Sequence, residues 1–506
     1  MTELDGRSQP VVLGGSYKIR APGIVGEATL VRQRSISGVT RSTTGAKEGA
    51  ALDKALASQG VQDVATVEVK VTRRIATPAG SSLRSANGDD ALELEVPAPK
   101  EGEGIVVLAV DESGAITWNY PLADNNEIAT SISRGPGAVV RFRVPRTPAV
   151  APPPGGQRSL FGTIGKKILK VLVYPLTDGA VGFVVNKIAE RWEDANRPYR
   201  FRQVTPDNYA SPDVPALSKT DPAWKDLAAG RSLLFIHGTF STTHSAFAGL
   251  TRDDVQVLSD AYGGRLFAFD HHTISHSPSR NVEEFLALFP ADVVINADVI
   301  CHSRGGLLSR ELAERAARQT LNGRLNIGKI VFVGVPNAGT ILTEPDHMTH
   351  MIDRMTTAID ALPDGPATWT LESLITAVKV IGHGGLKALD GLASMNPKGK
   401  YLGDLNVGEP GSAVYYGIAA NFQPKGTSFD RLALKQFAGN AVMDRIFMQE
   451  ENDLVVPTKG VAVWTGQHAA LGEKNVLTLD GSAGVTHTTY FSHPKVREHL
   501  RMWLTG

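Results

Sequence analysis

Residues 297–310 read Ala-Asp-Val-Ile-Cys-His-Ser-Arg-Gly-Gly-Leu-Leu-Ser-Arg, and this stretch decides the fold of the chain. Apolar residues precede a glycine-containing turn and then recur every four positions, as in a buried strand followed by a helix: Val299, Ile300, Leu308, Leu312 and Ala316. Ser303 lies in the turn. A sharp strand-turn-helix exposes a serine oxygen and directs helix N–H groups at an oxyanion. Ser303 is therefore the candidate nucleophile.

The turn departs from the G-x-S-x-G pattern at its first position, where Cys301 stands. Cysteine is small, so we expect the turn to form. Cys301 is the only cysteine of the 506 residues, which excludes intramolecular disulfides and any cysteine-built metal site. A single cysteine fits a reducing cytoplasm.

Composition narrows the function classes. Lys and Arg total 52 and Asp and Glu total 52, so no net charge favours nucleic acid as a partner. The N-terminus lacks a basic segment followed by an apolar one, and no run of about 18 apolar residues could span a membrane. We expect a cytoplasmic protein.

Residues 1–145 show the alternation of apolar and polar residues that is typical of strands with one wet face. The alternating runs lie at 67–72, 92–96 and 140–144, and a hairpin is expected from Ile105–Val110 and Ala115–Tyr120. We predict a small, mostly antiparallel β domain. It holds no cluster of catalytic side chains, so binding of a protein partner and structural support are both open roles.

A Pro/Gly-rich linker is predicted at 146–158. The connecting segment 159–220 begins with an apolar, lysine-interrupted run, Leu160–Trp192, which suggests two short amphipathic helices. Packing on the following domain is favoured over peripheral contact with a membrane surface.

From residue 221 to 506, near-continuous apolar runs alternate with helical patterns, which predicts a mostly parallel sheet with helices on both faces. The expected core strands are Leu233–Ile236, Arg265–Phe269, Val293–Cys301, Ile330–Val335, Val414–Ala419 and Val476–Leu479.

Acyl transfer through serine also needs a base, an acid and two oxyanion donors. The acid is expected on the polar loop before an apolar run, at Asp453, with Glu450 and Glu451 as its nearest rivals. The base is expected near the C-terminus before a final helix, at His487, whereas His493 at the start of that helix is expected to cap it or to face solvent. The loop after the strand ending in Ile236 would supply one backbone N–H, from Thr239 or Phe240, and Arg304 the other. His237 itself is expected to be structural.

Four stretches together resemble the lipase and esterase branch of the α/β-hydrolase superfamily. They are the run 230–241, the Cys-His-Ser-Arg-Gly-Gly turn, Gly-Val-Pro-Asn-Ala-Gly-Thr at 334–340 and the Asn-Asp loop at 452–453. The resemblance covers roughly Asp221 to the C-terminus. It implies serine hydrolysis of a small-molecule ester or lipid, with Ser303, Asp453 and His487 as the triad, and neither metal nor organic cofactor.

The insertion at about 341–405 is expected to be a helical cap over the substrate, because two apolar stripes follow helical spacing there. The first contains Met348, Met351, Ile352, Met355, Ile359 and Leu362, and the second contains Leu371, Leu374, Ile375, Val378 and Ile381. The histidines at 271, 272 and 276 lack the spacing of a metal-binding helix. Competing readings are an inactive hydrolase-fold scaffold, a phospholipase or thioesterase at a membrane surface, and an acyltransferase or peptidase using the same triad.

Overall fold

The computed structural model describes residues 1–31, 50–74, 91–111, 116–123, 129, 135, 137–145, 165–175, 186–314, 323–360, 367–382, 389–407, 412–423, 450–463 and 471–506. The predicted linker at 146–158 lies outside these residues. The described chain forms two compact units. The β unit contains residues from Met1–Ile188 and Ile352–Leu386, and the α/β unit contains residues from Ala189–Met351, Lys387–Lys425 and Met443–Gly506.

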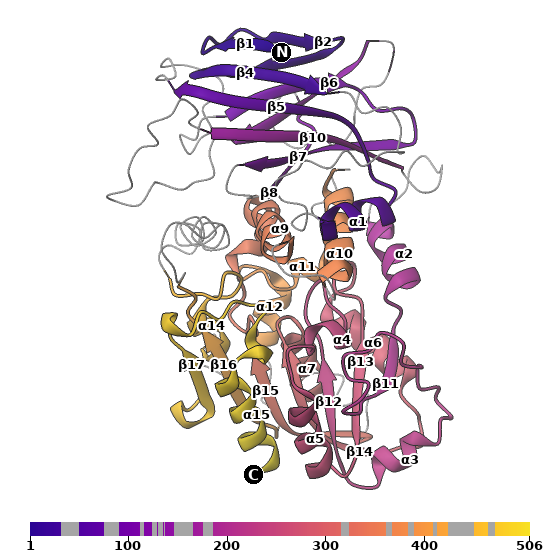
Figure 1. The fold of residues 1–506 in the computed structure, drawn as a ribbon. Coiled ribbons are helices and arrows are strands. Elements are labelled where there is room, and N and C mark those ends of the chain that lie inside the picture. Colours follow the sequence, from indigo (N-terminus) through magenta and orange to yellow (C-terminus); the bar gives the residue numbers. More distant parts are fainter. Residues whose placement is uncertain are drawn as a thin grey trace. The chain divides into compact units, whose positions relative to one another are not determined.

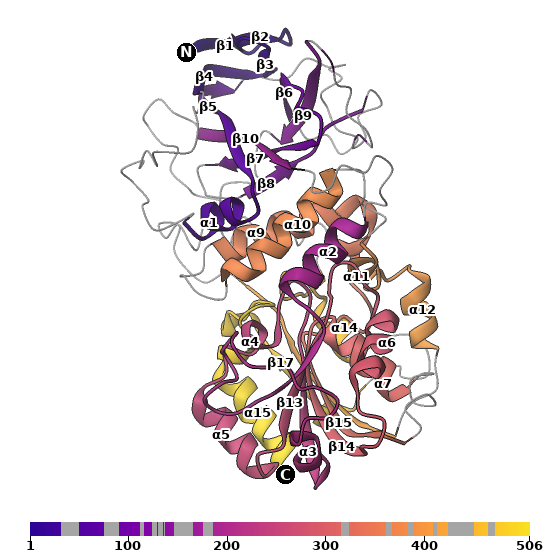
Figure 2. The ribbon, with the colours of Figure 1, turned by 90° about the vertical axis from the view of Figure 1, so that its right-hand side faces the viewer.

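The β unit is a sandwich of two antiparallel sheets (Figure 2). The six-stranded sheet has the order β1 (Thr2–Asp5), β4 (Ile24–Val31), β5 (Gln62–Arg74), β10 (Gly165–Pro175), β7 (Glu103–Asp111), β8 (Ile116–Asn119). The second sheet has the order β2 (Val11–Gly14), β3 (Tyr17–Arg20), β6 (Ala91–Pro97), β9 (Val139–Pro145). The expected strands are present, and β7 pairs with β8 in antiparallel as expected, while residues 112–115 of the predicted hairpin lie outside the described residues. The inward residues of these strands form one buried core.

The prediction of amphipathic helices in Leu160–Trp192 was wrong for Gly165–Pro175, which is strand β10 between β5 and β7. The lysines that interrupt this run do not share one side of the strand. Lys166 pairs with Glu68, whereas Lys167 is buried and donates to the Pro145 carbonyl. Within the described residues of this run, a helix is present at its end, α2 (Asn186–Asn196). The buried Leu169 and Val171 belong to the sandwich core and offer no face to a membrane.

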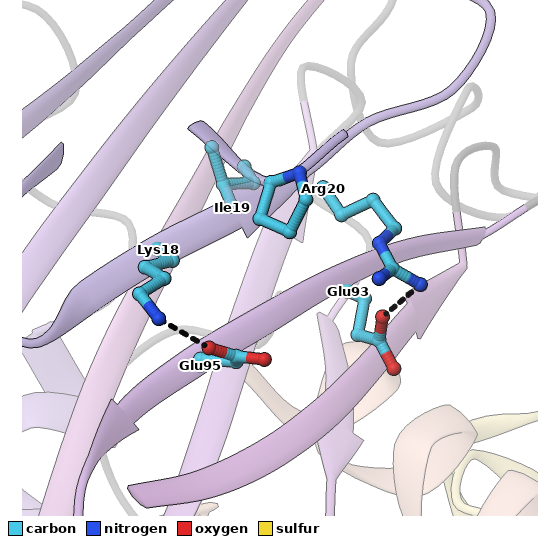
Figure 3. A pocket seen from close by; sticks show the side chains of 6 residues that line it. Lys18, Ile19, Arg20, Glu93 and Glu95 are labelled. Carbon is cyan, nitrogen blue, oxygen red and sulfur yellow. Dashed lines mark ion pairs between the residues drawn. The ribbon is translucent and has the colours of Figure 1, made fainter. Parts of the chain in front are cut away.

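Charged side chains align across β3 and β6 (Figure 3). Lys18 pairs with Glu95 at 3.5 Å and Arg20 with Glu93 at 3.2 Å, while Ile19 between them is fully buried. Partly exposed ion pairs of this kind contribute little to stability. They account for the polar alternation by which β6 was recognised, whereas β3 was not predicted from the sequence.

The expected helices of the 341–405 insertion are present as α9 (Pro345–Asp360) and α10 (Ala367–Gly382), and the predicted apolar stripe of α10 is at most 2% exposed. That stripe belongs to the β unit, where α10 packs against α1 (Ala50–Ser58) and β7 (Figure 1). The backbone N–H of Trp118 donates to Asp353 at 2.7 Å, and its indole N–H donates to Thr356 at 3.1 Å. A substrate-covering role for these helices stays a prediction.

The α/β unit is built on a seven-stranded sheet in which every pair except β11–β13 is parallel. Its order is β11 (Arg200–Gln203), β13 (Leu266–Asp270), β12 (Arg231–Ile236), β14 (Ile295–His302), β15 (Leu325–Val333), β16 (Val414–Ala420), β17 (Val476–Leu479). All six expected core strands are present. The sequence did not indicate β11, because an arginine at position 202 suggests a surface residue. In the structure Arg202 is buried, and its guanidinium donates to the carbonyls of Ser211 and Asn208.

Helices cover both faces of this sheet, as the sequence predicts (Figure 2). One face carries α5 (Arg252–Ala261) and α15 (Pro494–Thr505), which contact each other, and the other carries α6 (Pro278–Leu288) and α7 (Gly305–Glu314). Parallel strands place their carboxyl ends at one edge of a sheet, where ligands bind in open α/β folds. Loops that follow β12, β13 and β14 therefore meet at that edge.

Candidate active site

Ser303 lies in the turn between β14 and α7, with a left-handed backbone (φ 53°) that non-glycine residues rarely adopt. Two glycines after it allow the turn to pack closely. A Cβ on Gly305 would lie 2.4 Å from the His237 carbonyl oxygen, and one on Gly306 would lie 2.3 Å from Val335 Cγ1. The glycines thus hold α7 against the ends of neighbouring strands.

Cys301 fits the position where the pattern usually has its first glycine. Its side chain is fully buried, and its Sγ donates to the Val331 carbonyl at 3.4 Å. Burial raises the pKa of this thiol to about 12, so it stays neutral. The side chain therefore packs within the sheet as a small apolar group.

Ser303, His487 and Asp453 are joined by hydrogen bonds. His487 Nε2 lies 2.8 Å from Ser303 Oγ, and His487 Nδ1 lies 2.8 Å from Asp453 Oδ2. The three residues are 3%, 4% and 1% exposed, respectively. Little water surrounds the chain of groups, so the electrostatic interactions along it are stronger than they would be in water.

Several donors hold the Asp453 carboxylate. The backbone N–H groups of Val455 and Val456 donate to Oδ1 at 3.0 and 2.7 Å, and the Tyr490 hydroxyl donates to Oδ2 at 2.8 Å. Burial alone would raise the pKa of Asp453, but the neighbouring His487 and these backbone hydrogen bonds bring it below its usual value. The carboxylate is therefore ionised at neutral pH.

Two supporting residues were not found from the sequence. Tyr490 follows His487 by three positions, and its contact with Asp453 depends on a residue 37 positions away. His302 Nε2 lies 2.9 Å from the His487 carbonyl, so it carries the proton and donates. Burial lowers the pKa of His302 to about 3, which keeps the ring neutral. The His-Ser pair of the turn was the only available signal for His302.

The three predicted oxyanion donors differ in their hydrogen bonds. The Phe240 N–H donates to Thr273 Oγ1 at 3.2 Å. Within the described residues, the backbone N–H groups of Thr239 and Arg304 donate to no other group. Gly238 brings this loop against the turn, because a Cβ there would lie 2.5 Å from Ser303 Cβ. The geometry favours Thr239 over Phe240 as the partner of Arg304.

Backbone strain is concentrated in this region. In the part of the chain that the structure describes, the non-glycine residues with positive φ are Phe240 (58°), Ser303 (53°) and Leu454 (82°). One follows β12, one follows β14 and one follows Asp453 directly. Strained residues of this kind cost about 1–3 kcal/mol each and cluster at functional sites.

The Arg304 side chain is fully buried and turns away from the oxyanion position. Its guanidinium donates to the carbonyls of Gly391, His272 and His276 and to the hydroxyl of Ser394. Burial lowers its pKa to about 10, still far above neutral pH. A cation next to the turn thus ties the loop after β13 to the short helix α11 (Asp390–Ala393).

His237 makes structural contacts at the end of β12. His237 Nε2 accepts from the His271 N–H at 3.1 Å, and its Nδ1 lies 3.0 Å from the Gly238 carbonyl. Burial lowers the pKa of His237 to about 4. Among the described residues, no group of three His, Cys, Asp or Glu side chains is arranged to hold a metal ion.

A family model described as a domain of unknown function (DUF7379) matches residues 196–505, more than half of the chain. The chain belongs to this family. No curated protein matches it. None of the helices in the described residues has the length and apolar character needed to cross a membrane.

Solved structures similar to this DUF7379 protein include lipases and esterases. Lipase 1 from Pelosinus fermentans is 13% identical, with 54% of this chain and 97% of that chain covered and a TM-score of 0.39. EstA from Clostridium botulinum is 11% identical, with 64% and 99% covered and a TM-score of 0.37. Mature lipase BlEst2 from Bacillus licheniformis is 15% identical, with 55% and 93% covered and a TM-score of 0.30. Scores this low leave the chemistry to be inferred from the residues of this chain.

Proposed function

We propose that the α/β unit is a serine hydrolase of carboxylic esters. The observation that carries this proposal is the unbroken hydrogen-bond chain from Ser303 Oγ through the two ring nitrogens of His487 to Asp453 Oδ2, with 2.8 Å at each step. A serine hydroxyl is a weak nucleophile until an adjacent base accepts its proton. His487 is in contact with that hydroxyl, and Asp453 fixes the tautomer that leaves Nε2 free to accept.

In the first step, Ser303 Oγ attacks the ester carbonyl carbon while its proton passes to His487 Nε2. The carbonyl oxygen becomes an oxyanion, for which the N–H groups of Thr239 and Arg304 are the donors. Asp453 stabilises the imidazolium without taking its proton. Collapse of the intermediate releases the alcohol, which receives the proton from His487, and leaves an acyl-enzyme.

In the second step, water attacks the acyl-enzyme. His487 accepts the proton of the water and returns one to Ser303 as the carboxylic acid leaves. The methionine stripe of the insertion does not help to define the acyl group, because Met348, Met351 and Met355 are all buried, at 2%, 1% and 7% exposed. Apolar or lipid-like acyl chains stay the substrate class to be tested.

The proposal is tested by labelling the full-length protein with an alkyl fluorophosphonate, followed by a panel of p-nitrophenyl esters from short to long chain. We expect the wild type to label and Ser303→Ala to lose labelling and about 10⁶-fold in kcat. Ser309→Ala is the matched control, because Ser309 is a buried serine of α7 whose hydroxyl donates to the Gly305 carbonyl of its own helix. A folded wild type that does not label, or equal labelling of Ser303→Ala, would refute the proposal.

A further inference from the structure

Glu193 is a fully buried carboxylate on α2, three residues before the family match begins. Its oxygens accept from the backbone N–H groups of Thr273, Ile274 and Ser275, at 2.6, 3.0 and 2.9 Å, and from the Ser275 hydroxyl at 2.6 Å. A buried charge is costly unless such bonds compensate it. One side chain thus fixes the backbone of the loop that follows β13.

The Arg304 guanidinium contacts the same loop at its two ends, where it donates to the carbonyl groups of His272 and His276. The peptide groups of 272–276 therefore lie between a buried anion that accepts from their N–H groups and a buried cation that donates to their carbonyls. Charge-assisted hydrogen bonds are about twice as strong as neutral ones. The loop is consequently a rigid support next to the turn that carries Ser303.

Thr273 connects this support to the oxyanion loop. Its Oγ1 accepts from the Phe240 N–H at 3.2 Å and lies 3.4 Å from Glu193 Oε1, to which it donates. Phe240 has the left-handed backbone of a strained residue, and its side chain is fully buried. A conformation of this kind persists only when its surroundings hold it.

We propose that Glu193 and Thr273 are positioning residues for the oxyanion hole. By occupying the N–H of Phe240, Thr273 holds the loop so that the N–H of Thr239 faces the developing oxyanion together with that of Arg304. Glu193 fixes Thr273 through its backbone and its hydroxyl. The inference rests on the proposed ester hydrolysis and adds to it which donor is used and what sets its direction.

The test compares Thr273→Val with Thr273→Ser in the full-length protein. Valine has nearly the shape of threonine but cannot accept from Phe240, whereas serine keeps the hydroxyl. We expect Thr273→Val to lower kcat for a p-nitrophenyl ester and the rate of phosphonylation by about 10- to 100-fold with KM nearly unchanged, since loss of an entire oxyanion donor costs about 10²–10³. Thr273→Ser should stay within a few-fold of wild type.

Glu193→Gln adds an independent arm. It keeps the size of the side chain but replaces one acceptor oxygen by a donor amide, so we expect kcat to fall, with the double variant Glu193→Gln/Thr273→Val no worse than the poorer single variant. Thermal unfolding is followed for each variant, and Thr273→Ala replaces the valine variant if that one is not folded.

The outcomes separate the two proposals. If the wild type is active, any of three results overturns the positioning role and leaves the hydrolase proposal intact. These results are equal losses of kcat in Thr273→Val and Thr273→Ser, no loss in Thr273→Val, and a change in KM alone. A folded wild type that neither labels nor turns over ester overturns both.

Discussion

Tyr490→Phe isolates one hydrogen bond of the site. The Tyr490 hydroxyl and His487 Nδ1 both approach Asp453 Oδ2 at 2.8 Å, so they share one carboxylate oxygen. The substitution removes only the hydroxyl, and the ring stays in place against Gly334, where a Cβ would lie 2.8 Å from Tyr490 Cε2. Without the hydroxyl, the charge on Oδ2 acts on the imidazolium of His487 alone.

A hydrogen bond to a charged group contributes about 1.5–3 kcal/mol, and about 1.4 kcal/mol corresponds to one pH unit, so a full transfer to the Asp453–His487 pair would amount to about 1–2 pH units. The backbone hydrogen bonds from Val455 and Val456 to Asp453 remain and continue to stabilise its charge, so only part of that free energy is transferred to the pair. We therefore expect the acid limb of kcat/KM to move up by about 0.5–1 pH unit, because a more strongly stabilised imidazolium keeps its proton to higher pH. The plateau rate should change only a few-fold.

The assay is kcat/KM for a p-nitrophenyl ester between about pH 5 and 9, combined with urea unfolding. Tyr262→Phe is the matched control, since Tyr262 is a buried tyrosine that donates to Asp298 Oδ2 at 2.7 Å, outside the triad. Both variants should lose stability, and only Tyr490→Phe should shift the acid limb. A profile that superimposes on the wild type, or that moves to lower pH, would contradict this account of the site.

Three further outcomes are expected. Asp453→Asn should retain the fold and lose about 10⁴-fold in kcat, measured with the same ester, because the amide favours the wrong tautomer of the base. Gly306→Ala should lower the free energy of unfolding, measured in urea, by about 1–3 kcal/mol, because the added methyl group overpacks against Val335. In a double-mutant cycle, Val335→Ala should relieve part of that cost, whereas strict additivity would argue against the contact. Burial lowers the pKa of Lys379 from its usual 10.5 to about 8, so unfolding takes up a proton between these values and stability should rise with pH across that window. The urea midpoint of Lys379→Met should not show this rise.

The parallel sheet was predictable because its strands are buried on both faces and read as apolar runs, and the turn at Ser303 because glycines mark the close approaches that follow it. The same reasoning failed at β10. Three lysines within five residues interrupt the apolar run there, which suggested an amphipathic helix, and only the burial of Lys167 reveals a period of two. A long side chain that reaches a backbone carbonyl from inside a sandwich breaks the pattern on which such predictions rest.

The positions of Ser303, Asp453 and His487 along the chain were inferred from the order of their loops, whereas their supporting residues were not. The proposed choice of Thr239 over Phe240 rests on Thr273, which lies 33 residues from Phe240 and has no motif of its own. Glu193 precedes the sheet altogether. Contacts of this kind depend on which loops meet at the end of a sheet, which local periodicity does not encode.

The placement of α10 has a consequence for dividing this protein into fragments. The family match begins at residue 196 and includes α10, whose apolar stripe packs in the β unit against α1 and β7, both of which precede residue 196. A fragment that begins at the edge of the match would expose that stripe as an apolar patch, and exposed patches of this kind promote aggregation. The boundary of the family match therefore differs from the boundary between the compact units, so an expressed protein should keep both units.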